Sequence, residues 1–321
     1  PDFGMPGTHY EETTPEGEKR FRYLDMGENP PEGVIVNYFL ESEPQEPLEL
    51  VILDAGGEEI ERFTSKKSAT DPKDIESKDE DEKPSLPAKP GFNRFVWNMR
   101  YPGPEVKIDK ALEKPAYKPL GRGEGSPAGG PVAPPGNYQV QMKTGTAEIT
   151  HSFEITKDPR LKTSAKDFAL QFELWSKITN RVSATNSAVN KVRKINLQIT
   201  ELLGREIFTR AAPEKSLTAV RKATESLMNK LSQIENQLTQ NQYETPSDRL
   251  RHPTMLKQRM EALVSVVSIS DAAPPQQAYG VYEDLSSKID DQLALLSKLE
   301  KQDLPRVNKQ IEQAGIPKLQ A

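Results

Sequence analysis

The spacing of apolar residues along the chain changes near residue 160. Before it, apolar and polar residues alternate in short runs separated by prolines and glycines, a pattern typical of β-strands. After it, apolar residues return every three to four positions over long stretches, as they do on one face of a helix. The sequence therefore predicts a multidomain α+β chain: an N-terminal immunoglobulin- or fibronectin-like antiparallel β-sandwich followed by an antiparallel α-helical bundle.

The segment 89–103 is the expected centre of the sandwich. Four aromatic residues fall within ten positions of it, namely Phe92, Phe95, Trp97 and Tyr101, and Pro-Gly pairs stand at both ends. Because alternate residues of a strand point to the same face, Phe95 and Trp97 share one bulky apolar face. We expect this segment to form the central strand on which the other strands pack.

The remaining strands are expected at 34–40, 48–53, 59–64, 134–142 and 147–155. The first of them is so rich in apolar residues that the sequence predicts burial on both of its faces. Glycines at 56 and 57 and at 145 mark hairpin turns, because glycine adopts positive φ angles easily.

The expected organisation has three parts. Residues 1–29 form an extended lead-in, 30–158 the β-sandwich domain and 162–316 the helical bundle. Within the sandwich, 65–86 is expected to be a flexible loop because it combines many charges with almost no large apolar residue, and 102–135 is a connection rich in proline and glycine. The sequence starts at Pro1 with neither Met nor a signal peptide, which fits either an arbitrary cut or a processed piece of a longer protein.

A heptad repeat begins at Ser164. Its first line is Phe168, Trp175, Val182 and Val189, and its second is Ile178, Thr185, Val192 and Ile199. This repeat predicts a helix of about 40 residues with a coiled-coil-like seam, capped by Thr163 or Ser164. Further helices are expected at 214–240, 248–269, 276–301 and 303–314, and Pro253 is expected to interrupt the second of them near its start.

Composition narrows the classes of function. The chain has no cysteine, which rules out disulfides, thiolate zinc sites and cysteine nucleophiles. The net charge of −5 and the pI of about 5.6 do not favour a general nucleic-acid role. No run of 18 apolar residues is present, so no membrane-spanning helix is expected. The basic residues of the first long helix are interpreted as a solvated surface; they are Lys191, Arg193, Lys194 and Arg205.

No pattern of residues indicates catalysis or ligand binding. The three histidines, His9, His151 and His252, are far apart, and neither a GxSxG nor an SxxK motif occurs. Trp97 and Trp175 are interpreted as core residues rather than as platforms for a sugar ring. Adjacent acidic pairs at 11–12 and 290–291, the acidic run 79–82 and the glycine-rich 121–125 lack the context of a site. We therefore assign no catalytic, cofactor-binding or metal-binding residue, and we expect no cofactor.

Five segments carry a resemblance to a known family: NPPEGVIVNYFL at 29–40, LDAGG at 53–57, LPAKPGFNRFVWNMRYPG at 86–103, PPGNYQV at 134–140 and LPRVNKQIEQAG at 304–315. Together they resemble the C-terminal region of bacterial sortilin-like, BNR-repeat proteins related to glycoside hydrolases. In that family a β-propeller precedes the sandwich, and its blades carry SxDxGxTW boxes, which this sequence lacks. The resemblance therefore implies a place outside the cytoplasm, but it transfers no catalytic residue.

These observations lead to one expectation and one alternative. The chain is expected to be no enzyme but a structural and interaction module, an accessory subunit of a larger periplasmic, envelope-associated or secreted assembly. Its partner would be a protein, such as one with a propeller domain, contacted through the bundle surface or the 102–135 connection. The alternative is the accessory end of a sialidase-like or other BNR-propeller glycoside hydrolase, in contact with carbohydrate through the sandwich loops.

Overall fold

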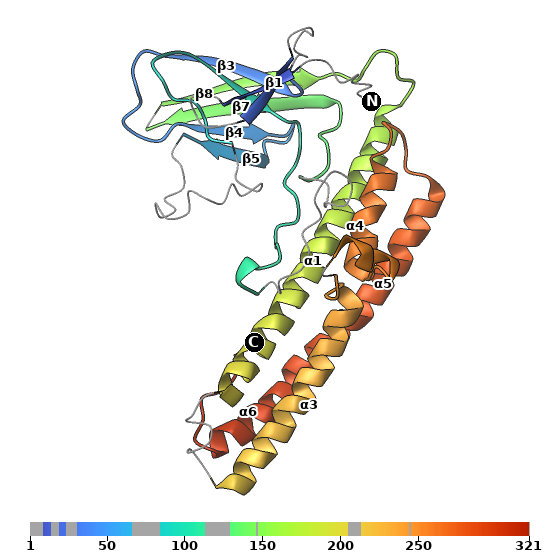
Figure 1. Ribbon diagram of the computed structural model, residues 1–321. Helices are drawn as coiled ribbons and strands as arrows, with labels where there is room; N and C mark the ends of the chain where they lie inside the picture. Colours follow the sequence, from blue (N-terminus) through green and yellow to red (C-terminus); the bar gives the residue numbers. More distant parts are fainter. Residues whose placement is uncertain are drawn as a thin grey trace.

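A computed structural model of the chain describes residues 9–13, 19–23, 31–65, 84–112, 129–145, 147–204, 213–243 and 245–320. It contains antiparallel sheets and α-helices, which confirms the predicted α+β class. Figure 1 shows the strands gathered at one end of a long group of helices. We call residues 31–155 the sheet part and residues 165–320 the helical part.

The strands that the structure describes form three antiparallel sheets. One has the order β5 (Glu59–Thr64), β4 (Glu49–Leu53), β7 (Gly136–Thr144), β8 (Ala147–Ile155), and a second pairs β3 (Val34–Leu40) with β6 (Gly91–Trp97). The third pairs β1 (His9–Thr13) with β2 (Lys19–Tyr23). The strands expected at 34–40, 48–53, 59–64, 134–142 and 147–155 are thus confirmed to within two residues, whereas the segment 89–103 contains a shorter strand, Gly91–Trp97.

The β3–β6 pair and the four-stranded sheet share one hydrophobic core. Leu50 and Ile52 of β4, Phe95 and Trp97 of β6, and Tyr138 of β7 are all buried in it. Trp97 has no exposed surface and lies 6.1 Å from the ring of Tyr138. Residues two apart on a strand share a face. The sequence predicted that Phe95 and Trp97 share one apolar face, and that face packs into this core.

Two expectations about the sheet part are wrong. Among the described residues β6 pairs only with β3, so it lies in a two-stranded sheet and is not a central strand. β3 partly buries alternate side chains and exposes the others, so it is not buried on both faces. Within the expected lead-in 1–29, the described residues form the paired strands β1 and β2, which are each too short, at five residues, to show a clear period in sequence.

The helical part is built from α1 (Ala165–Gly204), α3 (Glu214–Leu238), α4 (Leu256–Val267), α5 (Gln276–Lys298) and α6 (Leu304–Gln313). Short 3₁₀ turns lie at Lys110–Leu112 and Pro246–Leu250, and a π-helical turn at Leu299–Asp303 joins α5 to α6. All five of these described α-helices contribute to one hydrophobic core. α3 and α4 follow one another beside the length of α1 (Figure 1).

The predicted seam of α1 is confirmed. All eight of its positions are buried, from Phe168 to Ile199. Ser164 caps the helix, since its Oγ accepts a hydrogen bond from the Asp167 N–H at 3.2 Å while the Asp167 carboxylate accepts one from the Ser164 N–H. This reciprocal pair satisfies two donors that a helix start would otherwise leave free.

Two helix boundaries differ from the expectation. The expected interruption of the helix 248–269 at Pro253 is present, but the residues before it form a 3₁₀ turn and α4 begins only at Leu256. The predicted break near residue 302 is instead the π-helical turn, so α5 and α6 are continuous. Arg193 is also not on a solvated surface: its Nε lies 2.7 Å from Oε1 of Glu235, whose side chain is only 3% exposed.

A short segment fastens the sheet part to α1. We call residues 104–109 the strap. Its Val106 N–H donates to Ser183 Oγ at 2.9 Å, and its Val106 carbonyl accepts from Asn186 Nδ2 at 2.8 Å. Asn190 accepts from the Asp109 N–H at 3.0 Å and donates to the Lys107 carbonyl at 2.7 Å. Three polar side chains of one helix thus replace the partner strand that this extended backbone lacks.

The other expected loops lie partly outside the described residues. Of the predicted flexible loop 65–86, residues 66–83 are not described, and Leu86 is buried in the sheet core. Of the connection 102–135, residues 113–128 are not described, while the strap lies against α1.

Candidate functional site

The residues weighed as candidate chemistry lie on different elements of the structure. Trp97 and Trp175 are buried, with 0% and 4% of their surface exposed, so the interpretation of both as core residues is confirmed. His151 is exposed on β8, and His252 follows a 3₁₀ turn, where its carbonyl accepts the Tyr243 hydroxyl. Asp290 is paired with Arg181 of α1.

Residues 9–12, 79–82 and 121–125 were also weighed in the sequence. Their side chains lie outside what the structure describes. Across the described ranges, no group of three or more histidine, aspartate and glutamate side chains is arranged to hold a metal ion.

The feature of the sheet part that best fits a function is the outer side of the β3–β6 pair. Phe39 and Phe92 stand directly opposite each other there, with 58% and 88% of their surfaces exposed. Their ring centroids are 5.2 Å apart and the rings meet edge to face at 67°. We call this surface, formed by Ile35, Asn37, Phe39, Phe92, Arg94 and Val96, the aromatic face.

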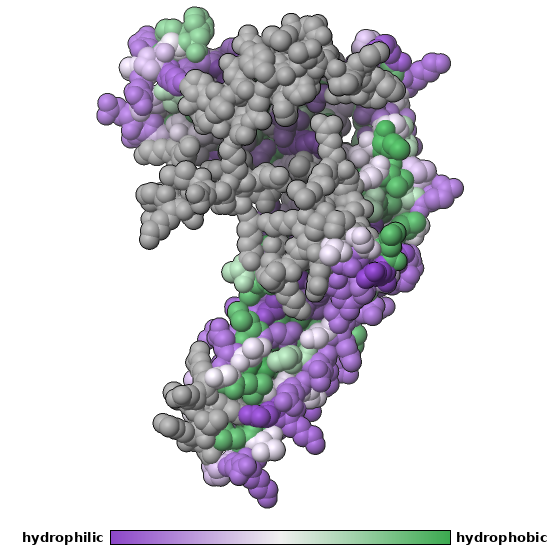
Figure 2. All heavy atoms as spheres, in the orientation of Figure 1, coloured by the Kyte–Doolittle hydropathy of each residue, from purple (hydrophilic) through white to green (hydrophobic). Residues whose placement is uncertain are grey.

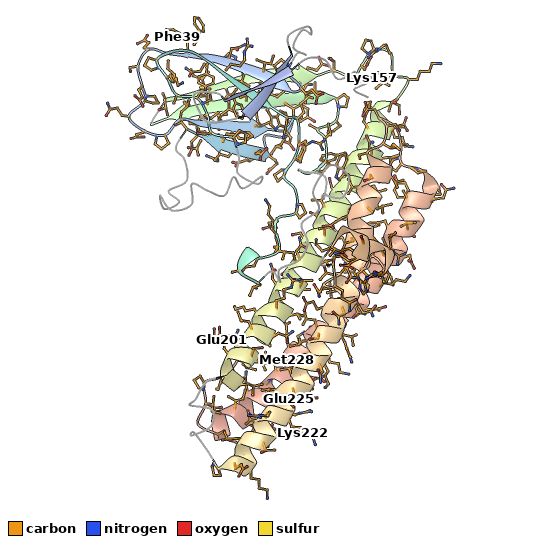
Figure 3. All side chains as sticks on the ribbon, viewed as in Figure 1. Phe39, Lys157, Glu201, Lys222, Glu225 and Met228 are labelled. Atoms are coloured by element: carbon orange, nitrogen blue, oxygen red, sulfur yellow. The ribbon has the colours of Figure 1, made fainter. Side chains whose placement is uncertain are left out.

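The antiparallel register of β3 and β6 builds the aromatic face. It sets Ile35 opposite Val96, Asn37 opposite Arg94 and Phe39 opposite Phe92. The intervening residues point into the core, which holds these six on the opposite side. Figure 3 shows Phe39 at the outer end of the sheet part, away from the helices.

The centre of the aromatic face is polar. The Arg94 Nε donates to the Asn37 Oδ1 at 3.0 Å, and Arg94 has no carboxylate partner among the residues that the structure describes. A cation between two apolar ends gives the surface both a hydrophobic contact area and a preference for an acidic group.

The sequence did not reveal this surface, for an identifiable reason. A run of apolar residues such as 34–40 has the same appearance whether it is buried on both faces or exposes aromatic residues on one. The one available signal was that Phe92 and Phe95 are three residues apart, so they cannot share a face of one strand.

Tight turns place the residues at the ends of β3 and β6. Gly33 has a φ of 142°, and a Cβ atom there would lie 2.2 Å from the Trp97 carbonyl oxygen. Only glycine permits so close an approach of the two backbones.

The Tyr38 hydroxyl donates to the Pro87 carbonyl, and burial raises the pKa of Tyr38 to about 12.

No family model matches the chain, and neither a curated protein nor a solved structure matches it. None of the helices that the structure describes is long and apolar enough to cross a membrane.

Proposed function

We propose that this chain is a non-catalytic interaction module that docks to a protein partner in a larger extracytoplasmic assembly. The observation that carries the proposal is the exposed pair Phe39 and Phe92 on the aromatic face. Exposed aromatic side chains that lie together are typical of the centres of protein interfaces, where they supply much of the binding energy.

The size of the apolar contact supports this proposal. A buried aromatic side chain removes roughly 150–250 Å² from water. Covering both exposed rings would stabilise a complex by on the order of 5 kcal/mol before ordering costs, at about 25 cal/mol per Å². The adjacent Arg94 would pair with an acidic residue of the partner and fix its orientation.

The proposal includes a finer interpretation of the fold. We interpret the sheet part as an immunoglobulin- or fibronectin-like sandwich, because its two larger sheets share a core and the Tyr138 hydroxyl bonds back to the Pro134 carbonyl at 2.7 Å. We interpret the helical part as an antiparallel bundle, because its helices share one core and α3 and α4 follow α1 along its length. Such paired scaffolds present surfaces without needing a reactive cleft.

The resemblance to sortilin-like, BNR-repeat proteins supports the same proposal. The residues that carry it have structural roles here: Gly33 permits the approach of β3 to Trp97, and the Asp54 carboxylate accepts the Gly56 N–H of a hairpin turn at 2.8 Å. A resemblance made of turn and core residues concerns the fold rather than an active site. We therefore propose a propeller-type protein of the periplasm, envelope or extracellular space as the partner.

Affinity purification with a matched variant tests this function. The tagged chain, mixed with envelope and secreted fractions of its source cells, should retain one protein in a stable ratio. The double variant Phe39→Ser/Phe92→Ser should lose that protein, while Ile149→Ser, at another exposed apolar position, should keep it. A monomer that captures no partner, or one captured equally by all three proteins, would contradict the proposal.

Contact with carbohydrate is the alternative function, and the structure changes where it would occur. Trp97 is fully buried and cannot contact a sugar, whereas the rings of Phe39 and Phe92 are exposed and could stack against one. Binding to a glycan array that the same double variant abolishes would favour the accessory end of a propeller glycoside hydrolase over a protein-docking module.

A further inference from the structure

A groove of about 640 Å³ runs between α3 and α5 on the helical part. Four carboxamides line it: Gln233, Asn236 and Gln237 from α3, and Gln292 from α5. The three from α3 are spaced i, i+3 and i+4, so they lie on one side of that helix. We call this surface the carboxamide groove. It is remote from the aromatic face, which belongs to the sheet part.

The four carboxamides form no hydrogen bond with the part of the chain that the structure describes. A carboxamide offers both a donor and an acceptor, which is the combination that an extended backbone requires. The groove therefore presents several such pairs along one line, with nothing in the described chain to satisfy them.

The strap shows how this chain uses the same chemistry elsewhere. On α1, Asn186 and Asn190 are also four residues apart, and both bind the backbone of the extended residues 106–109. Residues four apart on a helix are about 6 Å apart, which matches about two residues of an extended chain. Gln233 and Gln237 repeat this spacing on α3, with Gln292 facing them across the groove.

The charged and apolar residues that line the groove restrict the class of ligand that it could bind. Lys298, which lines the groove, has no ion-pair partner among the described residues, whereas Lys230 is paired with Asp303 at 2.9 Å. Leu295 in the groove is 50% exposed and offers an apolar contact. The π-helical turn contributes Leu299 and Asp303 to the lining, and such turns are frequent at functional sites.

The carboxamide groove continues into a second hollow of about 350 Å³. The two share Gln237 and Gln292, and the second adds Arg259 at the start of α4. Arg259 likewise has no carboxylate partner in the ranges that the structure covers. The second hollow also holds Asp291, which has no ion-pair partner in the described ranges, and Lys288, which is paired with Asp284. Among the charged groups without such a partner, two cations thus stand against one carboxylate beside the line of carboxamides.

We propose that the carboxamide groove binds an extended acidic segment of a partner protein. The carboxamides bond its backbone, as Asn186 and Asn190 bond the strap, while Lys298 and Arg259 pair with its carboxylates and Leu295 contacts an apolar side chain. A sugar would also bond to carboxamides, but it would leave the unpaired cations unused.

Fluorescence anisotropy with two labelled decapeptides tests this proposal. One is the acidic sequence GEPLEPLEPG, kept extended by its prolines, and the other has lysine in place of each glutamate. The full chain should bind the acidic peptide at least tenfold more tightly. The double variant Gln233→Ala/Gln237→Ala should weaken that binding at least fivefold, and Lys298→Glu should reduce the preference for the acidic peptide by at least tenfold.

The controls separate the groove from other surfaces. Lys222→Glu makes the same change of charge at an exposed position of α3 outside the groove (Figure 3) and should leave binding unchanged. Phe39→Ser/Phe92→Ser should also bind normally, so that failure of the groove and failure of the aromatic face are distinguishable. Circular dichroism establishes that each variant is folded.

Three results would overturn the proposal. They are equal binding of the two peptides, loss of binding in Lys222→Glu as large as in Lys298→Glu, and no binding at millimolar concentration. Binding of an oligosaccharide that the Gln233→Ala/Gln237→Ala variant abolishes, without peptide binding, would assign the groove to carbohydrate instead.

Discussion

The guanidinium carbon of Arg100 lies 5.5 Å from the centre of the Trp175 ring, so a cation of the sheet part rests on an aromatic side chain of α1. Beside them, the rings of Tyr101 and Phe172 meet edge to face at 4.7 Å. Arg100 also donates to the Gly130 carbonyl at 3.1 Å. Burial lowers the pKa of Arg100, but a guanidinium remains charged at neutral pH.

Removing this cation should weaken the joint between the two parts. Arg100→Met keeps the length of the side chain but loses the cation–π contact and the hydrogen bond, so we expect the free energy of unfolding to fall by about 1–2 kcal/mol. Arg94→Met, at an exposed site, should change it by less than about 0.5 kcal/mol. Urea denaturation measures both, and equal losses would show that the Arg100 contact contributes nothing of its own.

The strap should depend on one asparagine. Asn190→Ala removes a donor to Lys107 and an acceptor for the Asp109 N–H, so the amide of Asp109 should exchange with deuterium about tenfold faster. Asn180→Ala, an exposed position on the same helix, is the control and should leave that exchange unchanged. Exchange that is equally fast in the wild type would mean that the strap is not held against α1 in solution.

Gly33 should tolerate no side chain. Alanine there would require a positive φ and would bring its Cβ to 2.2 Å from a backbone oxygen, so we expect Gly33→Ala to lower the free energy of unfolding by more than about 3 kcal/mol. Gly136→Ala meets nothing within 4 Å and should be neutral or slightly stabilising. Thermal unfolding of the two variants compares them; similar melting temperatures would contradict the geometry of the β3–β6 pair.

Tyr38 should ionise unusually late. Its pKa is raised from 10.0 to about 12, because burial disfavours the phenolate. The neutral hydroxyl therefore contributes stability that is fully present below pH about 10 and is lost as the pH rises through about 12. Compared with Tyr38→Phe, the wild type should lose stability above pH 10. A difference in absorbance at 295 nm that titrates near pH 10 would show that Tyr38 is not buried.

The sequence predicted those elements whose burial repeats with a regular period. The seam of α1 could be read from the seven-residue spacing of Phe168, Trp175, Val182 and Val189, because a long helix buries the same line at every second turn. The core side of β6 followed from the alternation of Phe95 and Trp97. In both cases one element and its own spacing determine which side chains are buried.

The candidate sites could not be read in this way, because they arise from pairings between distant segments. Phe39 and Phe92 are more than 50 positions apart and meet only through the β3–β6 register. The strap meets α1 across about 80 positions, and Gln292 faces Gln237 only because α5 packs beside α3. The apolar content of β3 alone predicted that both of its faces are buried, whereas the β3–β6 pairing leaves one face exposed.

Arg193 and Glu235 form an ion pair whose side chains are 11% and 3% exposed, and Arg193 also donates to Asn241 Oδ1 at 2.8 Å. Breaking such a pair leaves one charge without compensation, so Glu235→Leu should lower the free energy of unfolding by about 3–5 kcal/mol. The double variant Arg193→Met/Glu235→Leu removes both charges and should recover most of that loss. A double-mutant cycle by urea denaturation measures the recovery. Additive losses would mean that water reaches Arg193, because a solvated cation does not need Glu235.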